Sequence, residues 1–177
     1  MQNKSNRKRK RCNLSRFDKE INQAKEKKKG IKETQILNFL KCAPSFIGCF
    51  AEDELRLLSV KTTPAHLIVN VDDSSLPGSH WIAIGIFDSR IEIFDTLGFN
   101  IFNWSRIPCN LLKFLHKFSQ TREVQVLKRI QDDTSVLCGF YCIFYVVSRP
   151  SCSFEKLESL FGTDLSANDS VLTKYFS

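Results

Sequence analysis

The segment QDDTSVLCGFYC, residues 131–142, combines residue types that suit covalent catalysis. Cys138 stands at the expected start of a helix, and Gln131 lies seven positions before it. At a helix N-terminus the macrodipole favours the thiolate, which is the nucleophilic form of cysteine. An amide at Gln131 could donate to an oxyanion together with the backbone N–H of Cys138. A cysteine in an apolar helix is more often a buried small residue, so catalysis requires a base and an orienting acid elsewhere.

The best candidate for the base is His80, one of three histidines in the chain. His66 begins an apolar stretch, and His116 falls in an amphipathic segment between two lysines. His80 instead opens an expected central strand directly after a loop, where a substrate could reach the imidazole. Trp81 follows it and is interpreted either as a shield for the histidine or as an ordinary core aromatic.

A hairpin is expected to bring an acid to this histidine. Residues 80–99 contain two apolar segments with strand character, separated by a short turn. With a two-residue turn at 88–89, Asp95 pairs with Ile82 and shares a face with His80, because alternate side chains point to one face. A three-residue turn would put Asp95 on the opposite face. If the turn has two residues, Asp95 is therefore the candidate acid that orients the imidazole of His80.

The elements that position these residues follow from the hydrophobic pattern. Besides the hairpin, it predicts strands at 65–71 and 123–130, and helices at 32–41, from about 109 to 120, at 135–149, at 154–162 and at 170–176. The helix at 135–149 is nearly all apolar, which is typical of a buried helix. Either Thr134 or Ser135 could cap it.

Positive charge is concentrated in the first 30 residues, which hold 12 Lys and Arg against 3 Asp and Glu. The net charge of these 30 residues is +9. Because the net charge of the whole chain is +7, the other 147 residues have a net charge of −2. This composition predicts a disordered arm over residues 1–30 ahead of one domain over 31–177. The arm suggests a nuclear-import signal, a DNA-binding segment or a solvated tail without a partner; its basic clusters are Arg7, Lys8, Arg9, Lys10, Arg11, Lys25, Lys27, Lys28 and Lys29.

Composition also argues against some classes of site and location. No stretch of about 18 apolar residues occurs, so no segment is expected to span a membrane. Seven cysteines without a secretory signal favour free thiols in a reducing compartment. No C-x-x-C pair occurs, so neither a metal nor another required cofactor is expected. Asp132 and Asp133 are interpreted as solvated loop charges or, alternatively, as groups that bind a substrate amine.

Several motifs resemble the adenovirus protease (adenain) family of cysteine endopeptidases, which shares a clan with the SUMO-specific proteases. These motifs are GSHW at 78–81, IFDTLGF at 93–99, and CGFYC at 138–142 with a glutamine seven positions before its first cysteine. LNFLKCAPSFIGCF at 37–50 resembles the first helix and the following loop of the family, so the resemblance covers residues 33–149. It implies an α+β fold in which a mixed central sheet packs against a buried helix that carries the nucleophile.

The resemblance also implies roles for the candidate residues. Cys138 would be the nucleophile, His80 the base, Asp95 its orienter and Gln131 an oxyanion donor. Trp81 would shield the histidine, and Gly139 would let a substrate backbone approach. The family has a glutamate where Asp95 stands, and aspartate is usual elsewhere in the clan. The family's cysteine that binds an activating viral peptide has no counterpart in FSQTREVQ at 118–125.

The expected function is that of a viral or virus-derived endopeptidase. It would act as a monomer in the host nucleus and the virion, and would cleave capsid or core precursor proteins after a small residue such as glycine. The basic arm would bind DNA, and viral DNA or a viral peptide could serve as activator. The alternatives are an isopeptidase of the deubiquitinase or SUMO-protease type and a non-catalytic DNA-binding accessory protein. Because no catalytic candidate precedes His80, deleting residues 1–30 is expected to leave peptide cleavage unchanged.

Overall fold

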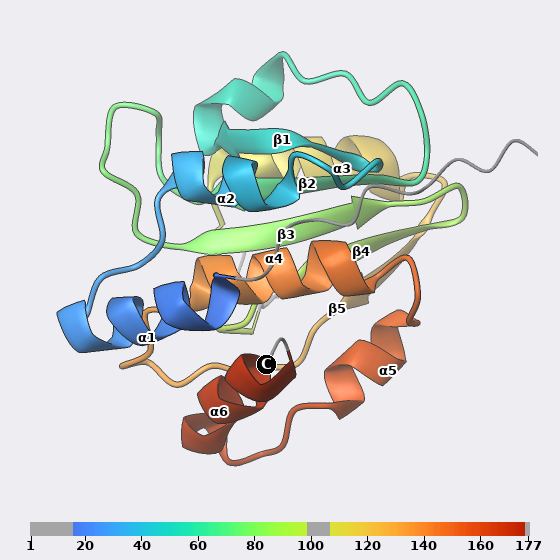
Figure 1. Ribbon diagram of the computed structural model, residues 1–177. Coiled ribbons are helices and arrows are strands. Elements are labelled where there is room, and N and C mark those ends of the chain that lie inside the picture. The colour runs from blue at the N-terminus through green and yellow to red at the C-terminus, as the bar shows by residue number, and fades with distance from the viewer. Residues whose placement is uncertain (1–15, 99–106, 176–177) are drawn as a thin grey trace, which may run out of the picture.

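The computed structural model describes residues 16–98 and 107–175, which fold around a mixed sheet of five strands (Figure 1). The strands lie side by side in chain order and are β1 (Phe46–Ala51), β2 (Ala65–Asn70), β3 (Trp81–Ile86), β4 (Arg90–Phe94) and β5 (Glu123–Val126). β1 is parallel to β2 and β4 is parallel to β5, whereas the two central pairings are antiparallel. The expected α+β class with a mixed central sheet is confirmed.

Helices cover both faces of the sheet (Figure 1). Helix α4 (Cys138–Ser148) packs against β3 on one face, and helix α3 (Cys109–Ser119) lies on the other with the short 3-10 helix η1 (Glu52–Arg56). The remaining helices lie on the α4 side and are α1 (Phe17–Lys27), α2 (Glu33–Leu40), α5 (Phe154–Ser159) and α6 (Leu165–Tyr175). Each face of the sheet therefore has its own apolar core.

The pairing of β3 with β4 has the register that a two-residue turn produces. Ile86 pairs with Ile91, and the residues inside this pair close the hairpin around a turn at 88–89. The predicted turn is confirmed. The same register, continued past the end of β4, places Asp95 on the face of His80.

Strand β1 is the element that the hydrophobic pattern does not reveal. It begins shortly after Pro44 and contains Gly48 with a φ of 140°, and both residue types usually interrupt regular structure. The pairing with β2 shifts between Phe46 and Gly48, so the glycine occupies an irregularity in the ladder. Because β1 is an edge strand, it pairs only with β2, so the irregularity disturbs hydrogen bonding to a single neighbouring strand.

Helix α1 shows that the expected disorder of residues 1–30 is wrong for the second half of that range. Phe17, Ile21 and Ala24 fall on one helical face and are all buried. Phe17 packs edge-on against Phe140 of α4, with ring centroids 5.5 Å apart. The segment is therefore part of the folded body. Its many charges lie on the outer side of the helix and dominate its composition.

A buried ionic network joins α4 to β4. Glu92 on β4 is fully buried, and its two carboxylate oxygens accept hydrogen bonds from Arg149 at 2.6 and 2.7 Å. The hydroxyl of Tyr145 donates at 2.7 Å and Arg90 Nε at 2.8 Å, so the charge is paired and its oxygens are satisfied. Glu92 precedes Asp95 by three residues, so this network fixes the end of β4 relative to α4.

We predict that the packing of α1 is required for stability. Ile21→Ala should lower the free energy of unfolding by about 2–5 kcal/mol, because it leaves a cavity at a fully buried position. The neighbouring exposed residue supplies the control: Asn22→Ala should change stability by no more than about 0.5 kcal/mol. Urea unfolding of both variants measures the difference. Equal unfolding midpoints for the two variants would contradict the packing role of α1.

The same packing changes the expected effect of truncation. Removing residues 1–30 takes Phe17 and Ile21 out of the core, so the truncated chain should unfold at a lower urea concentration and lose activity with its fold. A truncation of residues 1–15 keeps all the described core residues and is the matched control. It should retain the unfolding midpoint of the full chain.

Candidate active site

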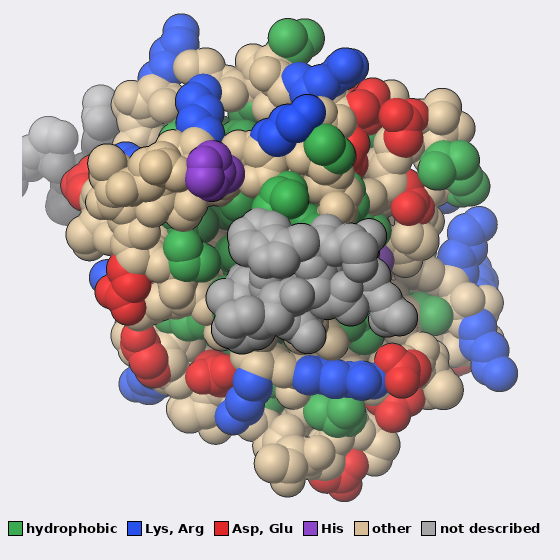
Figure 2. All heavy atoms as spheres, turned by 180° about the vertical axis from the view of Figure 1, so that it is seen from behind, with side chains coloured by type: hydrophobic (Ala, Val, Ile, Leu, Met, Phe, Trp, Pro, Cys, Tyr) green, Lys and Arg blue, Asp and Glu red, His purple; other side chains and the backbone are tan. Residues whose placement is uncertain are grey.

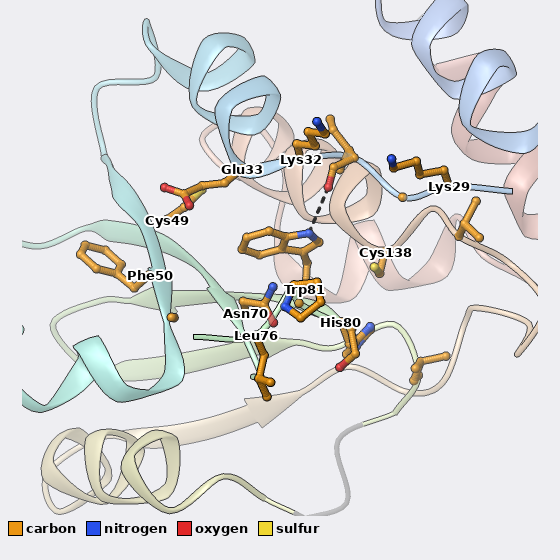
Figure 3. A pocket seen from close by; sticks show the side chains of 18 of the residues that line it. Lys29, Lys32, Glu33, Cys49, Phe50, Asn70, Leu76, His80, Trp81 and Cys138 are labelled. Atoms are coloured by element: carbon orange, nitrogen blue, oxygen red, sulfur yellow. Dashed lines mark hydrogen bonds between the residues drawn. The ribbon is translucent and has the colours of Figure 1, made fainter. Parts of the chain in front are cut away.

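The candidate residues meet at one end of the sheet, where β3 begins, β4 ends and α4 begins. A pocket of about 850 Å³ opens there, and its walls come from the link 29–33, the loop 73–81 and residues 131–138. The candidate catalytic and supporting residues that line it are His80, Trp81, Gln131 and Cys138. Figure 3 labels His80, Trp81 and Cys138 in this pocket. The fold thus brings together side chains that are up to 58 positions apart in the sequence.

His80 and Asp95 form the pair that the hairpin register predicts. Nε2 of His80 lies 2.7 Å from Oδ1 of Asp95, and both side chains are mostly buried. The same carboxylate oxygen accepts the backbone N–H of Leu97 at 3.0 Å, which fixes its direction. Because Asp95 engages Nε2, the imidazole has its Nδ1 left for the thiol.

The surroundings of His80 favour the protonated imidazole. Burial works against the charged form, but hydrogen bonds to Asp95 and Cys138, together with the attraction of both groups, raise the pKa of His80 from 6.5 to about 9. His80 and Cys138 line the same pocket, so the candidate base and the candidate nucleophile face one site. This is the arrangement that activates a cysteine for attack.

Cys138 is the first residue of α4 and is 8% exposed at the pocket. The N–H groups in the first turn of a helix have no acceptor within the helix, so they are available to a bound anion. The expected cap by Thr134 or Ser135 is wrong, because Leu137 is the N-cap and no side chain caps the helix. The hydroxyl of Ser135 instead accepts the N–H of Leu137 at 3.3 Å.

Cys142 lies one turn further along α4 in a different environment. It is fully buried, and its thiol donates to the carbonyl of Trp81 at 3.4 Å. Burial, and then the proximity of Cys138 and Asp95, raises the pKa of this thiol well above its usual value. Cys142 is therefore a packing residue.

Gln131 is held rigidly at the pocket wall and is only 2% exposed. Its backbone N–H donates to the carbonyl of Thr96 at 2.9 Å, and its Nε2 donates to the carbonyl of Ser135 at 2.8 Å. Its Oε1 accepts the hydroxyl of Thr96. The amide is thus positioned beside the start of α4, where an oxyanion donor is needed.

Trp81 and Gly139 pack against the link between α1 and α2. The indole N–H of Trp81 donates to the carbonyl of Ile31 at 3.3 Å (Figure 3). A Cβ at Gly139 would lie 2.3 Å from Cγ2 of Ile31 and 3.1 Å from Cδ1 of Trp81. The expected opening for a substrate backbone at Gly139 is wrong, because Ile31 fills this space. Shielding of the histidine by Trp81 stays a prediction.

Two residues of the site escape sequence reasoning. Thr96 is fully buried and contacts Gln131 through both its backbone and its side chain. Asn70, at the end of β2, pairs with Trp81 and lines the pocket (Figure 3). Neither residue type suggests catalysis by itself. The one available signal is position, since Thr96 follows Asp95 and Asn70 ends a strand beside the one that His80 precedes.

Of the basic clusters in the first 30 residues, only the second falls in the described range, and it lies at the end of α1 and directly after it. Nζ of Lys25 lies 3.5 Å from the carbonyl of Asp169 on α6, whereas Lys27, Lys28 and Lys29 are exposed. The first cluster, Arg7, Lys8, Arg9, Lys10 and Arg11, lies outside the described residues. Figure 2 views the molecule from behind relative to Figure 1. In this view, acidic and basic side chains are interspersed over the described residues.

The two aspartates after Gln131 take part in local contacts. Oδ1 of Asp132 accepts two hydrogen bonds from Thr134, one from its backbone N–H at 2.9 Å and one from its hydroxyl at 2.6 Å. Asp133 pairs with Arg129 at 2.6 Å and is exposed at the pocket. Asp132 is thus a loop-forming charge, while binding of a substrate amine by Asp133 stays an open alternative.

Within residues 16–98 and 107–175, no cluster of three His, Cys, Asp or Glu side chains could hold a metal ion. No helix in the same ranges has the length and apolar character needed to cross a membrane. Searches against protein-family models and against curated proteins find no match to this chain. The geometry of the site is therefore the basis for the function proposed below.

We predict that His80 titrates well above the normal range for histidine. Its raised pKa means that the imidazolium is present below about pH 9 and is lost as the pH rises through that value. Asp95→Asn removes an anionic partner, so the midpoint should move to lower pH. NMR of the imidazole protons measures both midpoints. A midpoint near 6.5 for the unmodified chain would contradict the ion pair.

Proposed function

We propose that this protein is a cysteine peptidase with Cys138 as nucleophile, His80 as general acid and base, and Asp95 as the orienter of the imidazole. The observation that carries the proposal is the imidazole of His80. Its Nε2 lies 2.7 Å from Oδ1 of Asp95, and His80 lines the same pocket as Cys138, whose proximity helps to raise the pKa of the imidazole. The three groups stand in the order acid, base, nucleophile, and the base and the nucleophile line one pocket. A purely structural histidine has no need of this arrangement.

The geometry supports acyl transfer through a thioester. The sulfur of Cys138, its proton held by His80, attacks the scissile carbonyl carbon and forms a tetrahedral oxyanion. The N–H of Cys138 and Nε2 of Gln131 would stabilise this oxyanion. When the C–N bond breaks, His80 donates its proton to the leaving amine. His80 then takes a proton from water, the resulting hydroxide attacks the thioester, and the thiolate leaves to restore the pair.

The pocket is suited to an extended peptide. Its walls come from chain segments on two sides, with Lys29 and Lys32 on one and Leu76 on another (Figure 3). The resemblance to the adenain family extends the proposal to cleavage after glycine in viral capsid or core precursors, in the host nucleus and the virion. Peptides that vary the residue before the scissile bond test the glycine preference. Cleavage of ubiquitin-like fusions in preference to such peptides would favour the isopeptidase alternative.

Substitution of the two cysteines of α4 tests the nucleophile. Cys138→Ala should abolish peptide cleavage without a large loss of stability, because the residue lies at the start of a helix and is in contact with the pocket. Cys142→Ala is the matched control and should retain activity, with a small loss of stability from a cavity. His80→Ala should reduce kcat by about 100- to 10,000-fold. An active Cys138→Ala variant would refute the proposal.

Alkylation tests the same assignment without a substrate. At neutral pH a thiol-directed alkylator should modify Cys138 faster than the exposed Cys109, because only Cys138 is paired with an imidazolium. Cys49 lines the same pocket, but burial raises the pKa of its thiol to about 12, so it should react slowly. Peptide mapping after brief treatment gives the order. His80→Ala should remove the advantage of Cys138.

A further inference from the structure

We infer that Thr96 is a positioning residue for the oxyanion donor, because its hydroxyl holds Oε1 of Gln131 while the carbonyl of Ser135 selects the orientation that presents Nε2 to the substrate. This inference rests on the proposed function and adds a residue to its machinery. Thr96 contacts neither the nucleophile nor the base through any hydrogen bond among the described residues. It acts on the reaction only through Gln131.

The orientation of the Gln131 amide follows from the chemistry of its neighbours. One end of the amide faces the carbonyl of Ser135 at 2.8 Å. A carbonyl oxygen only accepts hydrogen bonds, so this end must be Nε2. The other end is therefore Oε1, and it faces the hydroxyl of Thr96. Because Oε1 only accepts, the hydroxyl of Thr96 must be the donor.

This orientation leaves one amide hydrogen for the substrate. Nε2 carries two hydrogens, and the carbonyl of Ser135 takes one of them. The second has no acceptor among the described residues, and Gln131 lines the pocket that holds Cys138. A rotation of the amide by 180° would present an oxygen to the oxyanion, and the two like charges would repel each other. The carbonyl of Ser135 opposes this rotation, because it cannot donate to an oxygen, and the hydroxyl of Thr96 holds Oε1 in the unrotated position.

Burial makes the contact energetically significant. Thr96 is fully buried and Gln131 is 2% exposed, so solvent cannot readily replace the hydroxyl as a partner for Oε1. An unpaired buried acceptor is costly, and the amide would reorient to avoid it. The backbone of Thr96 is held separately, because its carbonyl accepts the N–H groups of Ile130 and Gln131, each at 2.9 Å. Loss of the hydroxyl alone should therefore leave the loop in place.

The other end of the amide is anchored as well. The hydroxyl of Ser135 donates to Oδ1 of Asp169 at 3.0 Å, and the hydroxyl of Tyr141 donates to the same oxygen at 3.0 Å. Helix α6 thus holds the carbonyl of Ser135 in place against α4. The amide of Gln131 is fixed between two independent anchors, Thr96 at its oxygen and Ser135 at its nitrogen.

The test compares variants that remove or retain the hydroxyl of Thr96. Thr96→Val is nearly isosteric and lacks the donor, and Thr96→Ala removes the donor without adding a methyl group. Both should lower kcat by about 10- to 100-fold and change KM by less than about 2-fold. The reason is that the hydrogen bond from Nε2 of Gln131 to the oxyanion forms in the transition state. Thr96→Ser keeps the donor and should retain kcat within about 3-fold. Gln131→Ala should lower kcat by about 100- to 1,000-fold.

Two further measurements separate positioning from a general structural role. A peptide aldehyde forms a tetrahedral adduct with an oxyanion, so it should bind Thr96→Val at least about 10-fold more weakly than the unmodified chain. Alkylation of Cys138 forms no oxyanion, so its rate should stay unchanged in the same variant. A parallel loss in both measurements would show that Thr96 merely supports the fold and would overturn the inference.

The inference and the proposed function fail in different ways. Retained kcat in Thr96→Val together with a loss in Gln131→Ala would overturn the positioning role and leave the peptidase intact. A chain without any Cys138-dependent cleavage would overturn the peptidase and the oxyanion role together. In either case, NMR of the Gln131 side-chain amide protons tests the anchor directly. Their resonances should shift in Thr96→Val and stay in place in Thr96→Ser, and unchanged resonances in both would refute the anchor.

Discussion

The register of the β3–β4 hairpin is the constraint on which the candidate site depends. A turn of two residues sets Asp95 on the face of His80, and one more residue in the turn would reverse the side on which Asp95 points. The next residue, Thr96, then meets the loop that carries Gln131. One short turn at 88–89 thus determines the surroundings of both the imidazole and the candidate oxyanion donor.

Helix α4, which carries the candidate nucleophile, has to be placed against this hairpin with equal accuracy. The apolar core alone would allow α4 to shift along the sheet, because contacts between aliphatic and aromatic side chains are not directional. The contacts of Glu92 with Arg149 and Tyr145 are directional and fully buried. They tie the far end of α4 to β4, a few residues from Asp95. A buried charge pair of this kind adds little net stability but specifies one arrangement.

Much of the site could be predicted from the sequence, because it depends on local rules. Strand parity and turn length relate Asp95 to His80, and the position of Cys138 at a helix start follows from the apolar pattern. Helix α1 could not be found by composition, since its buried face consists of only a few apolar residues among many charges. The packing of Ile31 against Gly139 also could not be predicted, because it joins segments that are distant in the chain.

The two buried histidines show why the partner of a residue matters more than its type. His66 is 2% exposed, and burial lowers its pKa to about 4, with the attraction of Glu92 opposing the shift and the repulsion of Arg149 adding to it. Its Nδ1 lies 2.8 Å from the hydroxyl of Ser45, a neutral group that cannot compensate for the lost hydration of an imidazolium. His80 is also largely buried, yet hydrogen bonds to Asp95 and Cys138 reverse the direction of the shift. The same side chain is therefore held neutral inside the sheet and charged at its end. Of these two histidines, only the charged one shares a pocket with a candidate nucleophile, Cys138, and this is the physical reason for proposing a catalytic role for His80.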